Sequence, residues 1–133
     1  MAGICIAVAL SSVVLAHLPD RVTLAWEHSV EKTRWEEDYA LSERRLALEE
    51  ARIQGTGAGM EIPDGAWFQG GMWHYHPDIA PLPQVRFTNS LVPGGYDICT
   101  KGRCVRLREL IGDDQRNLSL LPCDAAGAAP VKR

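Results

Sequence analysis

Apolar and polar residues alternate with a period of two along several short segments of the chain. Residues 21–30 place apolar side chains such as Leu24 and Trp26 on one face and polar side chains such as Thr23 on the other. This alternation is typical of a half-buried β-strand. Residues 34–41 alternate in the same way, and the short link between the two runs predicts an antiparallel pair.

A third strand is predicted over residues 45–53. The same segment is rich in helix-forming residues, so a helix over residues 42–50 is the alternative. The alternation of Leu46 and Leu48, and its agreement with two preceding strands, favours a turn at residues 42–44 followed by a strand.

Turn signals divide the rest of the chain into short elements. Glycines and a proline between residues 54 and 71 predict a loop, and aromatic residues follow it up to Pro77. Further strands are expected at residues 85–88 and 118–121. The fold class predicted is therefore mainly β, as a small antiparallel β-sandwich or partly open barrel.

The N-terminal segment is apolar and carries no Asp, Glu, Lys or Arg between residues 2 and 18. It predicts a short helix that serves as a cleaved signal peptide, with Ala16 at the cleavage site, or as a retained membrane anchor. A buried helix of the folded domain is a third alternative. The expected organisation is a signal or anchor at residues 1–18, a single domain at 19–123 and a flexible tail at 124–133.

The cysteines point to the same compartment. Cys99 and Cys104 lie symmetrically about Lys101 and Gly102, a pair suited to a tight hairpin turn, so the two sulfurs face each other across the strands. The pattern predicts a disulfide and therefore an oxidising compartment outside the cytosol. The C-x₄-C spacing does not fit a redox pair, and Cys123 is left without a partner in this scheme.

The charge distribution argues against a nucleic-acid partner, and the arrangement of polar side chains argues against catalysis. The net charge is −3 with acidic and basic residues interleaved, so no nucleic-acid partner is expected. His28 and Ser29 are neighbours on a strand and point to opposite faces, which argues against a serine hydrolase. The carboxylates Glu31, Glu36 and Glu37 match no catalytic motif. We therefore predict a non-enzymatic protein without a cofactor.

The histidines leave one alternative open. His74 and His76 point to the same side of an extended segment, and His28 could supply a third ligand, as in zinc sites built from three histidines. The simpler interpretation is that these histidines are partly exposed and pack beside Trp73 and Tyr75, and no metal site is predicted.

Four stretches of the chain resemble one bacterial family. They are residues 26–37, residues 55–61, Met72-Trp-His-Tyr75 and the Cys99–Cys104 hairpin, and together they are similar to the family known as domain of unknown function 1850. The resemblance implies a small exported protein encoded beside tripartite TRAP transporters of the TAXI type, with no established catalytic residues.

These observations give a functional expectation. We expect an accessory protein of such an uptake system, in the periplasm or anchored to the inner membrane, with transporter membrane subunits or the solute-binding protein as partners. A small periplasmic ligand-binding or metal-binding domain is the alternative. The predicted binding surface comprises His28, Ser29, Glu31, Lys32, Arg34, Trp35, Glu36, Gly57, Gly59, Met60, Glu61, Trp73, His74 and Tyr75.

Overall fold

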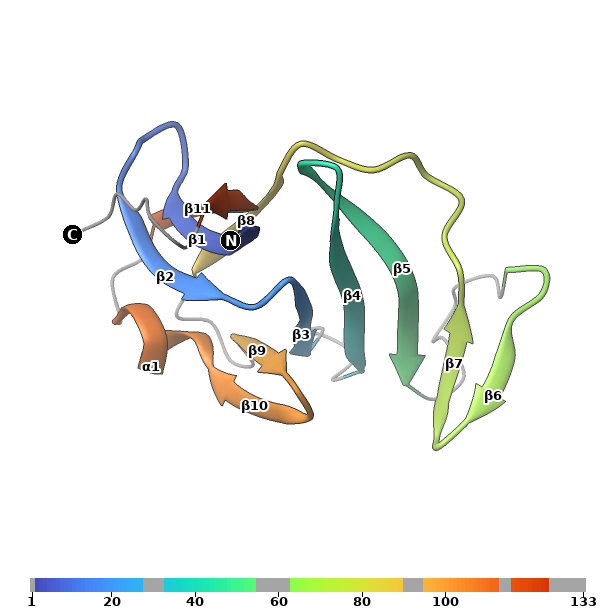
Figure 1. The fold of residues 1–133 in the computed structure, drawn as a ribbon. Helices are drawn as coiled ribbons and strands as arrows, with labels where there is room; N and C mark the ends of the chain where they lie inside the picture. The colour runs from blue at the N-terminus through green and yellow to red at the C-terminus, as the bar shows by residue number, and fades with distance from the viewer. Residues whose placement is uncertain (1, 28–32, 55–62, 90–94, 113–115, 125–133) are drawn as a thin grey trace.

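The fold consists of two antiparallel sheets that share a core (Figure 1). The structure is a computed structural model and describes residues 2–27, 33–54, 63–89, 95–112 and 116–124. In these residues almost all regular structure is strand, so the mainly β prediction is confirmed.

The larger sheet has seven strands. Its strands are β3 (Arg21–Glu27), β4 (Arg34–Ser42), β5 (Arg45–Gln54), β6 (Trp67–Gln69), β7 (Met72–Tyr75), β9 (Tyr96–Thr100) and β10 (Arg103–Arg106). They run in the order β10-β9-β3-β4-β5-β7-β6. The predicted meander of three strands, β3 to β5, therefore forms the centre of this sheet.

The smaller sheet has four strands and packs against part of the larger one. Its strands are β1 (Ala2–Val8), β2 (Val14–Leu18), β8 (Val85–Asn89) and β11 (Arg116–Asp124), in the order β2-β1-β11-β8. A short helix, α1 (Leu107–Ile111), follows β10. Strands β7 and β6 extend the large sheet away from the small one (Figure 1).

The turn and strand predicted after β4 are both present. Glu43 and Arg44 have φ values of 51° and 67°, the left-handed conformation that a two-residue turn of the mirror-image type requires. In β5 the register passes from Tyr39 opposite Leu48 to Asp38 opposite Glu50, so Glu49 is the extra residue of a β-bulge. The bulge reverses the alternation, so that Leu48 and Ile53 lie on the same face of the sheet.

The helix predicted over residues 2–18 is wrong, because this segment forms β1 and β2. Strand β1 lies between β2 and β11, and Ile4, Cys5 and Ile6 are fully buried. Among the described residues, no helix has the length and apolar character needed to cross a membrane. In this structure, residues 2–18 therefore contribute two strands to the smaller sheet.

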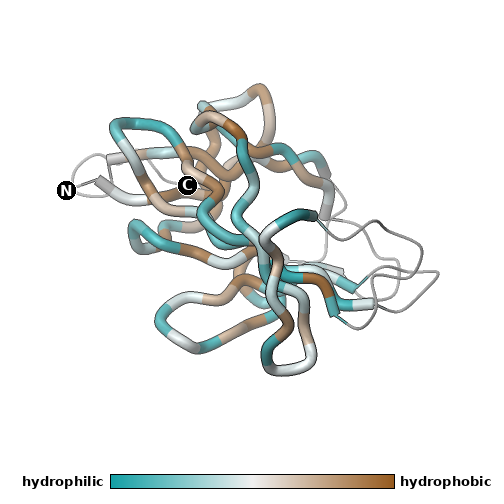
Figure 2. The backbone as a smooth tube through the Cα atoms, turned by 90° about the vertical axis from the view of Figure 1, so that its right-hand side faces the viewer, coloured by the Kyte–Doolittle hydropathy of each residue, from teal (hydrophilic) through white to brown (hydrophobic). Residues whose placement is uncertain are grey.

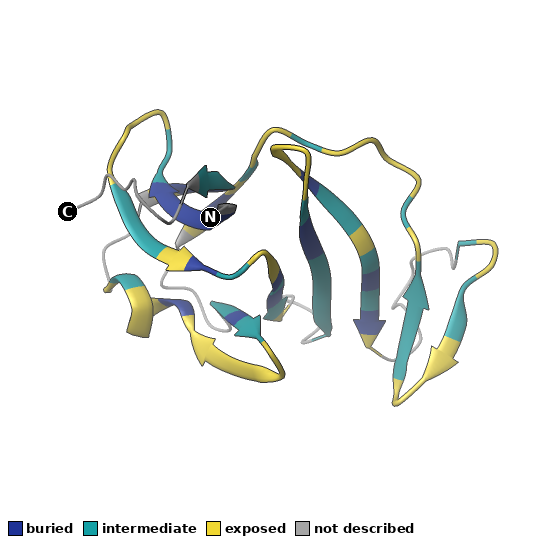
Figure 3. Cartoon of the chain, in the orientation of Figure 1, coloured by how far each residue is buried: buried dark blue, intermediate teal, exposed yellow. Residues whose placement is uncertain are grey.

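The core lies between the two sheets. Its buried members are Ile4, Ile6, Leu18, Val22, Leu24, Tyr39, Leu46, Phe87, Ile98, Leu107, Leu118 and Leu120. Figure 3 shows buried residues on β1 and along β3 to β5, and exposed residues on β6, β10 and the turns. Hydrophilic and hydrophobic stretches alternate along the backbone in Figure 2, as expected for strands with one covered face.

Two disulfides cross-link neighbouring strands. The predicted Cys99–Cys104 bridge is present, with the two residues directly opposite in β9 and β10. Lys101 and Gly102 adopt positive φ values in the connecting turn, as the hairpin prediction requires. A second bridge, between Cys5 of β1 and Cys123 of β11, was not predicted, because Cys5 was assigned to a leader segment.

The Cys99–Cys104 bridge should contribute modestly to stability. It closes a loop of only a few residues, so the double substitution Cys99→Ser/Cys104→Ser is expected to lower the free energy of unfolding by about 2 kcal/mol. Equilibrium denaturation in urea measures this change. A loss of most of the stability would instead assign the hairpin bridge a central role in holding the fold.

Two elements were missed in the sequence. The segment predicted as a loop between residues 54 and 71 contains strand β6, which pairs with β7 through a turn at Gly70 and Gly71. Both glycines have positive φ values, the conformation that their lack of a side chain permits. The helix α1 is too short to leave a periodic signal.

Candidate functional site

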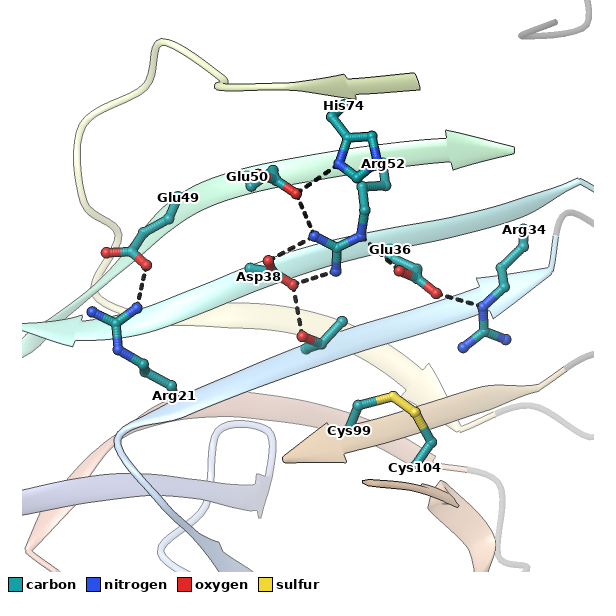
Figure 4. A network of polar contacts seen from close by, with 11 residues as sticks. Arg21, Arg34, Glu36, Asp38, Glu49, Glu50, Arg52, His74, Cys99 and Cys104 are labelled. Carbon is teal, nitrogen blue, oxygen red and sulfur yellow. Dashed lines mark hydrogen bonds and ion pairs between the residues drawn. A yellow bond between two sulfur atoms is a disulfide. The ribbon is translucent and has the colours of Figure 1, made fainter. Parts of the chain in front are cut away.

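The outer face of the seven-stranded sheet, the face turned away from the small sheet, carries a network of charged side chains centred on Arg52 (Figure 4). The guanidinium donates to both carboxylate oxygens of Asp38, with Nη2···Oδ1 2.6 Å and Nη1···Oδ2 2.7 Å. It also donates from Nε to Glu36 at 2.7 Å and from Nη1 to Glu50. Arg52 therefore joins three carboxylates from β4 and β5.

Neighbouring groups extend this network across the sheet. Thr23 on β3 donates its hydroxyl to Asp38 at 2.6 Å, and Arg34 forms ion pairs with Glu36 and with Asp97 on β9. On β7, His74 places Nδ1 3.0 Å from Glu50. The network links the five adjacent strands β9, β3, β4, β5 and β7 through side chains as well as through backbone hydrogen bonds.

The carboxylates are stabilised in their charged form. Burial alone would raise the pKa of Asp38, but hydrogen bonds from Arg52 and Thr23 lower it overall. The pKa of Glu36 is lowered in the same way by Arg34 and Arg52, and that of Glu50 by His74 and Arg52. Hydrogen bonding to Asp38 in turn raises the pKa of Arg52.

An open cleft of about 350 Å³ lies beside this network. Its walls include Thr23, Asp38 and Arg52, the exposed Arg21–Glu49 ion pair, and the Cys99–Cys104 hairpin with Lys101. Because its acidic and basic groups are largely bonded to one another, the network acts mainly as a cross-sheet clamp. A ligand in the cleft would have to compete with those ion pairs.

The inner face of the same sheet, turned toward the small sheet, carries a different group, here called the aromatic–Glu37 surface. It comprises Trp26, Trp35, Glu37, Tyr75 and Tyr96. Each of these side chains is half-buried and keeps part of its surface accessible.

Stacking orders the rings of this surface. The Trp26 and Trp35 rings stack with centroids 6.2 Å apart and planes at 15°, and Tyr96 lies 5.8 Å from Trp26. Tyr96 also contacts Phe87 of the small sheet, so this end of the surface is attached to the core. Trp35 lies outside the core cluster, and its buried indole Nε1 has no hydrogen-bond partner in the part of the chain that the structure describes.

Glu37 is the acidic member of the surface. It lies in the row Leu24–Glu37–Ala51–Tyr75, between two apolar side chains. Its Oε1 accepts a hydrogen bond of 2.7 Å from the Tyr39 hydroxyl. Within the described part of the chain, no Lys, Arg or His side chain forms an ion pair with Glu37. A carboxylate among apolar neighbours usually has a cationic partner, so this one is unusual.

Glu37 also sets the electrostatics of the phenols. The chain has three tyrosines, and burial followed by interaction with Glu37 raises the pKa of each. The effect is largest at Tyr39, which is buried and hydrogen-bonded to Glu37. The negative charge of Glu37 therefore acts over the whole inner face of this region.

A family model described as a domain of unknown function, DUF1850, matches residues 22–107. The chain belongs to the DUF1850 family. No curated protein and no solved structure matches it. The matched residues of this DUF1850 protein contain nearly the whole seven-stranded sheet and β8, whereas β1, β2 and β11 lie outside them.

The predicted binding residues of the DUF1850 protein divide between the two faces. Arg34, Glu36 and His74 lie on the outer face, whereas Trp35, Trp73 and Tyr75 lie on the inner face. One ligand therefore cannot contact all six from one side. The other predicted residues, His28, Ser29, Glu31, Lys32, Gly57, Gly59, Met60 and Glu61, lie outside the described part of the chain.

The histidines proposed as alternative metal ligands are engaged by the protein. His74 contacts the Gln69 carbonyl through Nε2 as well as Glu50 through Nδ1, and Nδ1 of His76 contacts the Glu49 carbonyl. Both rings also lie against Trp67. The aromatic partner of both histidines is therefore Trp67, whereas Trp73 and Tyr75 had been expected. His28 lies outside the described residues.

The described residues do bring one other set of metal-ligating side chains together. Cys5, His17 and Cys123 place their ligand atoms within 4.8 Å of one another. The two sulfurs are joined in a disulfide, and His17 Nδ1 lies 3.2 Å from the Cys5 sulfur. A disulfide sulfur is no thiolate, so the set does not form a metal site in this state.

Several residues of these two faces were missed in the sequence. Arg52, Glu50 and Asp97 of the outer network lie on strands whose register was not predicted. Glu37 is recognisable in the sequence, because it is an acidic residue at a position where the alternation of the second strand predicts an apolar one. Tyr96 carried no signal of its own.

The tyrosines give a direct test of the inner face. We expect all three phenols to ionise above the ordinary pKa of about 10, and Glu37→Gln to lower these values by removing a nearby negative charge. The unfolded chain loses its phenolic protons first, so the free energy of unfolding should fall as the pH rises above about 10. Spectrophotometric titration of phenolate absorbance measures both effects.

Glu49→Gln is the matched control for this titration, because Glu49 is exposed on the outer face and pairs with Arg21. It should leave the phenol titrations unchanged. Ordinary tyrosine titration in the wild type, or equal shifts in both variants, would contradict the placement of Glu37 beside the phenols.

Proposed function

We propose that this DUF1850 protein is a non-enzymatic accessory protein of a TRAP-type solute uptake system of the TAXI type. It works in the periplasm, either secreted or attached to the inner membrane, with transporter membrane subunits or the solute-binding protein as partners. Because residues 2–18 form strands of the core, the proposal assigns no membrane attachment to them.

The observation that carries the proposal is the aromatic–Glu37 surface. Trp and Tyr side chains that remain half-exposed are enriched where proteins recognise ligands and partners, because each ring offers a large contact area at low entropic cost. Two stacked tryptophans, two tyrosines and one carboxylate on one face make a recognition surface. The link to an uptake system is what the resemblance to the family implies, and two disulfides support an oxidising compartment.

Affinity purification tests the proposal. The tagged protein is isolated from solubilised membranes of its host, and its partners are identified by mass spectrometry. We expect a TRAP permease or solute-binding protein to be recovered with the wild type and with Glu49→Gln, and at least about tenfold less with Trp35→Ala. Recovery of the wild type without any transporter component would overturn the proposal.

The Trp35→Ala variant needs a check on folding, because the indole stacks on Trp26. Trp35→Phe keeps an aromatic ring at this position and should retain most of the stability. If both variants fold and both recover the transporter as well as the wild type does, the inner face is not the docking surface.

The alternative function, a small periplasmic ligand-binding domain, is favoured by one observation. Glu37 has no cationic partner among the described residues, and such a partner could come from a ligand.

A further inference from the structure

The acidic side chains on the two faces of the seven-stranded sheet differ in whether they form ion pairs with described residues. On the outer face, Glu36, Asp38 and Glu50 each pair with Arg52, and Asp97 pairs with Arg34. On the inner face, Glu37 has only the Tyr39 hydroxyl as a hydrogen-bond partner within the described residues. Among the described residues, cations therefore compensate the outer carboxylates and none pairs with the inner one.

The surroundings of Glu37 are suited to a positive charge. The face of an aromatic ring attracts cations, and the attraction grows when the site is partly shielded from water. Trp35 and Tyr39 are the inward-facing neighbours of Glu37 along β4, and the charge of Glu37 acts on Tyr75 and Tyr96. The same carboxylate that disfavours phenolate formation favours a cation at this point.

Only part of the row around Glu37 is accessible, because Leu24 and Ala51 are buried. Ala51, whose side chain is a single methyl group, separates Glu37 from Tyr75 across the strands. Glu37 and Tyr75 both keep accessible surface. The nearby Trp35 indole N–H is buried and has no hydrogen-bond partner among the described residues, whereas Glu37 accepts one hydrogen bond, from Tyr39.

We propose that the aromatic–Glu37 surface binds the ammonium group of a small organic cation, with Glu37 as the counter-ion and the tryptophan and tyrosine rings as its walls. The proposal rests on the recognition role assigned to this surface above and names the chemical class of the ligand. A metal ion is a poorer fit, because one carboxylate among aromatic rings does not provide the oxygen ligands that hard cations require.

Calorimetric titration of the full chain with choline tests the proposal. The uncharged isostere dimethylbutanol serves as the comparison ligand, because it has the same shape and lacks the positive charge. We expect saturable binding of choline and at least about tenfold weaker binding of dimethylbutanol, because only the cation gains from Glu37 and the ring faces. Equal affinity for the two ligands, or no saturable binding of choline, would overturn the proposal.

Two isosteric variants locate the site. Glu37→Gln should weaken choline binding by at least about tenfold, whereas Glu49→Gln, which removes an acid from the outer face, should leave it unchanged. Circular dichroism establishes that both variants are folded. Choline binding that survives Glu37→Gln places the cation elsewhere and contradicts the assignment.

The two proposals can fail separately. Choline binding without recovery of a transporter component overturns the accessory role and leaves a cation-binding domain. Recovery of the transporter by a protein that binds no choline overturns the ligand class and leaves the docking role.

Discussion

Removal of residues 2–16 is expected to abolish cooperative folding of this chain. The deletion takes away β1, the inner strand between β2 and β11, and with it Ile4 and Ile6 of the core. Replacing a buried isoleucine by alanine lowers the free energy of unfolding by about 2–5 kcal/mol. The deletion also removes Cys5. The disulfide between Cys5 and Cys123 closes a loop that contains nearly the whole chain, and it stabilises the fold by about 4–5 kcal/mol in the chain-entropy model. These losses match the whole stability of a typical domain, about 5–15 kcal/mol.

Thermal unfolding followed by circular dichroism measures the effect. Two point substitutions serve as references for the deletion. Ile6→Ala should lower the free energy of unfolding by about 2–5 kcal/mol. Leu10→Ala should lower it by less than about 0.5 kcal/mol, because Leu10 is 86% exposed in the turn after β1. A deleted protein that still unfolds cooperatively near the wild-type temperature would show that the segment is dispensable, as a leader peptide would be.

Arg52→Ala is expected to be the most damaging substitution of a surface charge. It leaves Glu36, Asp38 and Glu50 close together without the guanidinium that joins them. The side chain of Arg52 is only 15% exposed, so solvent replaces little of what is lost. Removing one partner of a buried ion pair lowers the free energy of unfolding by about 3–5 kcal/mol. Because the three carboxylates are partly exposed, we expect a loss of about 3 kcal/mol for Arg52→Ala.

Arg21→Ala is the matched control, because Arg21 forms a single ion pair with Glu49 and its side chain is 71% exposed. Exposed pairs contribute about 0–1 kcal/mol, so urea denaturation should separate the two arginines clearly. Similar losses for both variants would mean that the Arg52 network stabilises the sheet no more than an ordinary surface pair.

The central strands could be predicted from the sequence because one face of each is covered. Leu24 and Trp26 alternate with polar residues in β3, and the turn at Glu43 and Arg44 separates two such runs. Strand β1 could not be recognised in this way, because it is buried on both faces from Ile4 to Ala7. A strand of this kind reads as a continuous apolar run, which is also the pattern of a signal or anchor helix.

The candidate site was only partly predictable for a related reason. The segment around Trp35 was singled out by its composition, but the division of its side chains between two faces, and the partners of Glu36, depend on strand register. The bulge at Glu49 shifts that register by one residue and brings Arg52 opposite Glu36. The bridge between Cys5 and Cys123 joins residues 118 positions apart, and no local pattern marks such a pair.

The two faces of the sheet support a division of roles. The outer face is bonded within itself through Arg52 and Arg34 and stiffens the sheet. The inner face, beyond the part covered by the small sheet, presents aromatic rings and Glu37, which has no cationic partner among the described residues. A stiff sheet keeps the stacked rings of Trp26 and Trp35 in place, which favours binding because less ordering is needed when a partner arrives.

Site-specific photo-crosslinking in the host tests most directly whether the inner face is the working surface. A photoreactive phenylalanine derivative replaces Tyr75 on the inner face in one strain and Glu49 on the outer face in another. If the inner face is the working surface, we expect crosslinks to a TRAP transporter component from position 75 and none from position 49. Crosslinks from position 49 alone would place the working surface on the charged outer face and contradict the account.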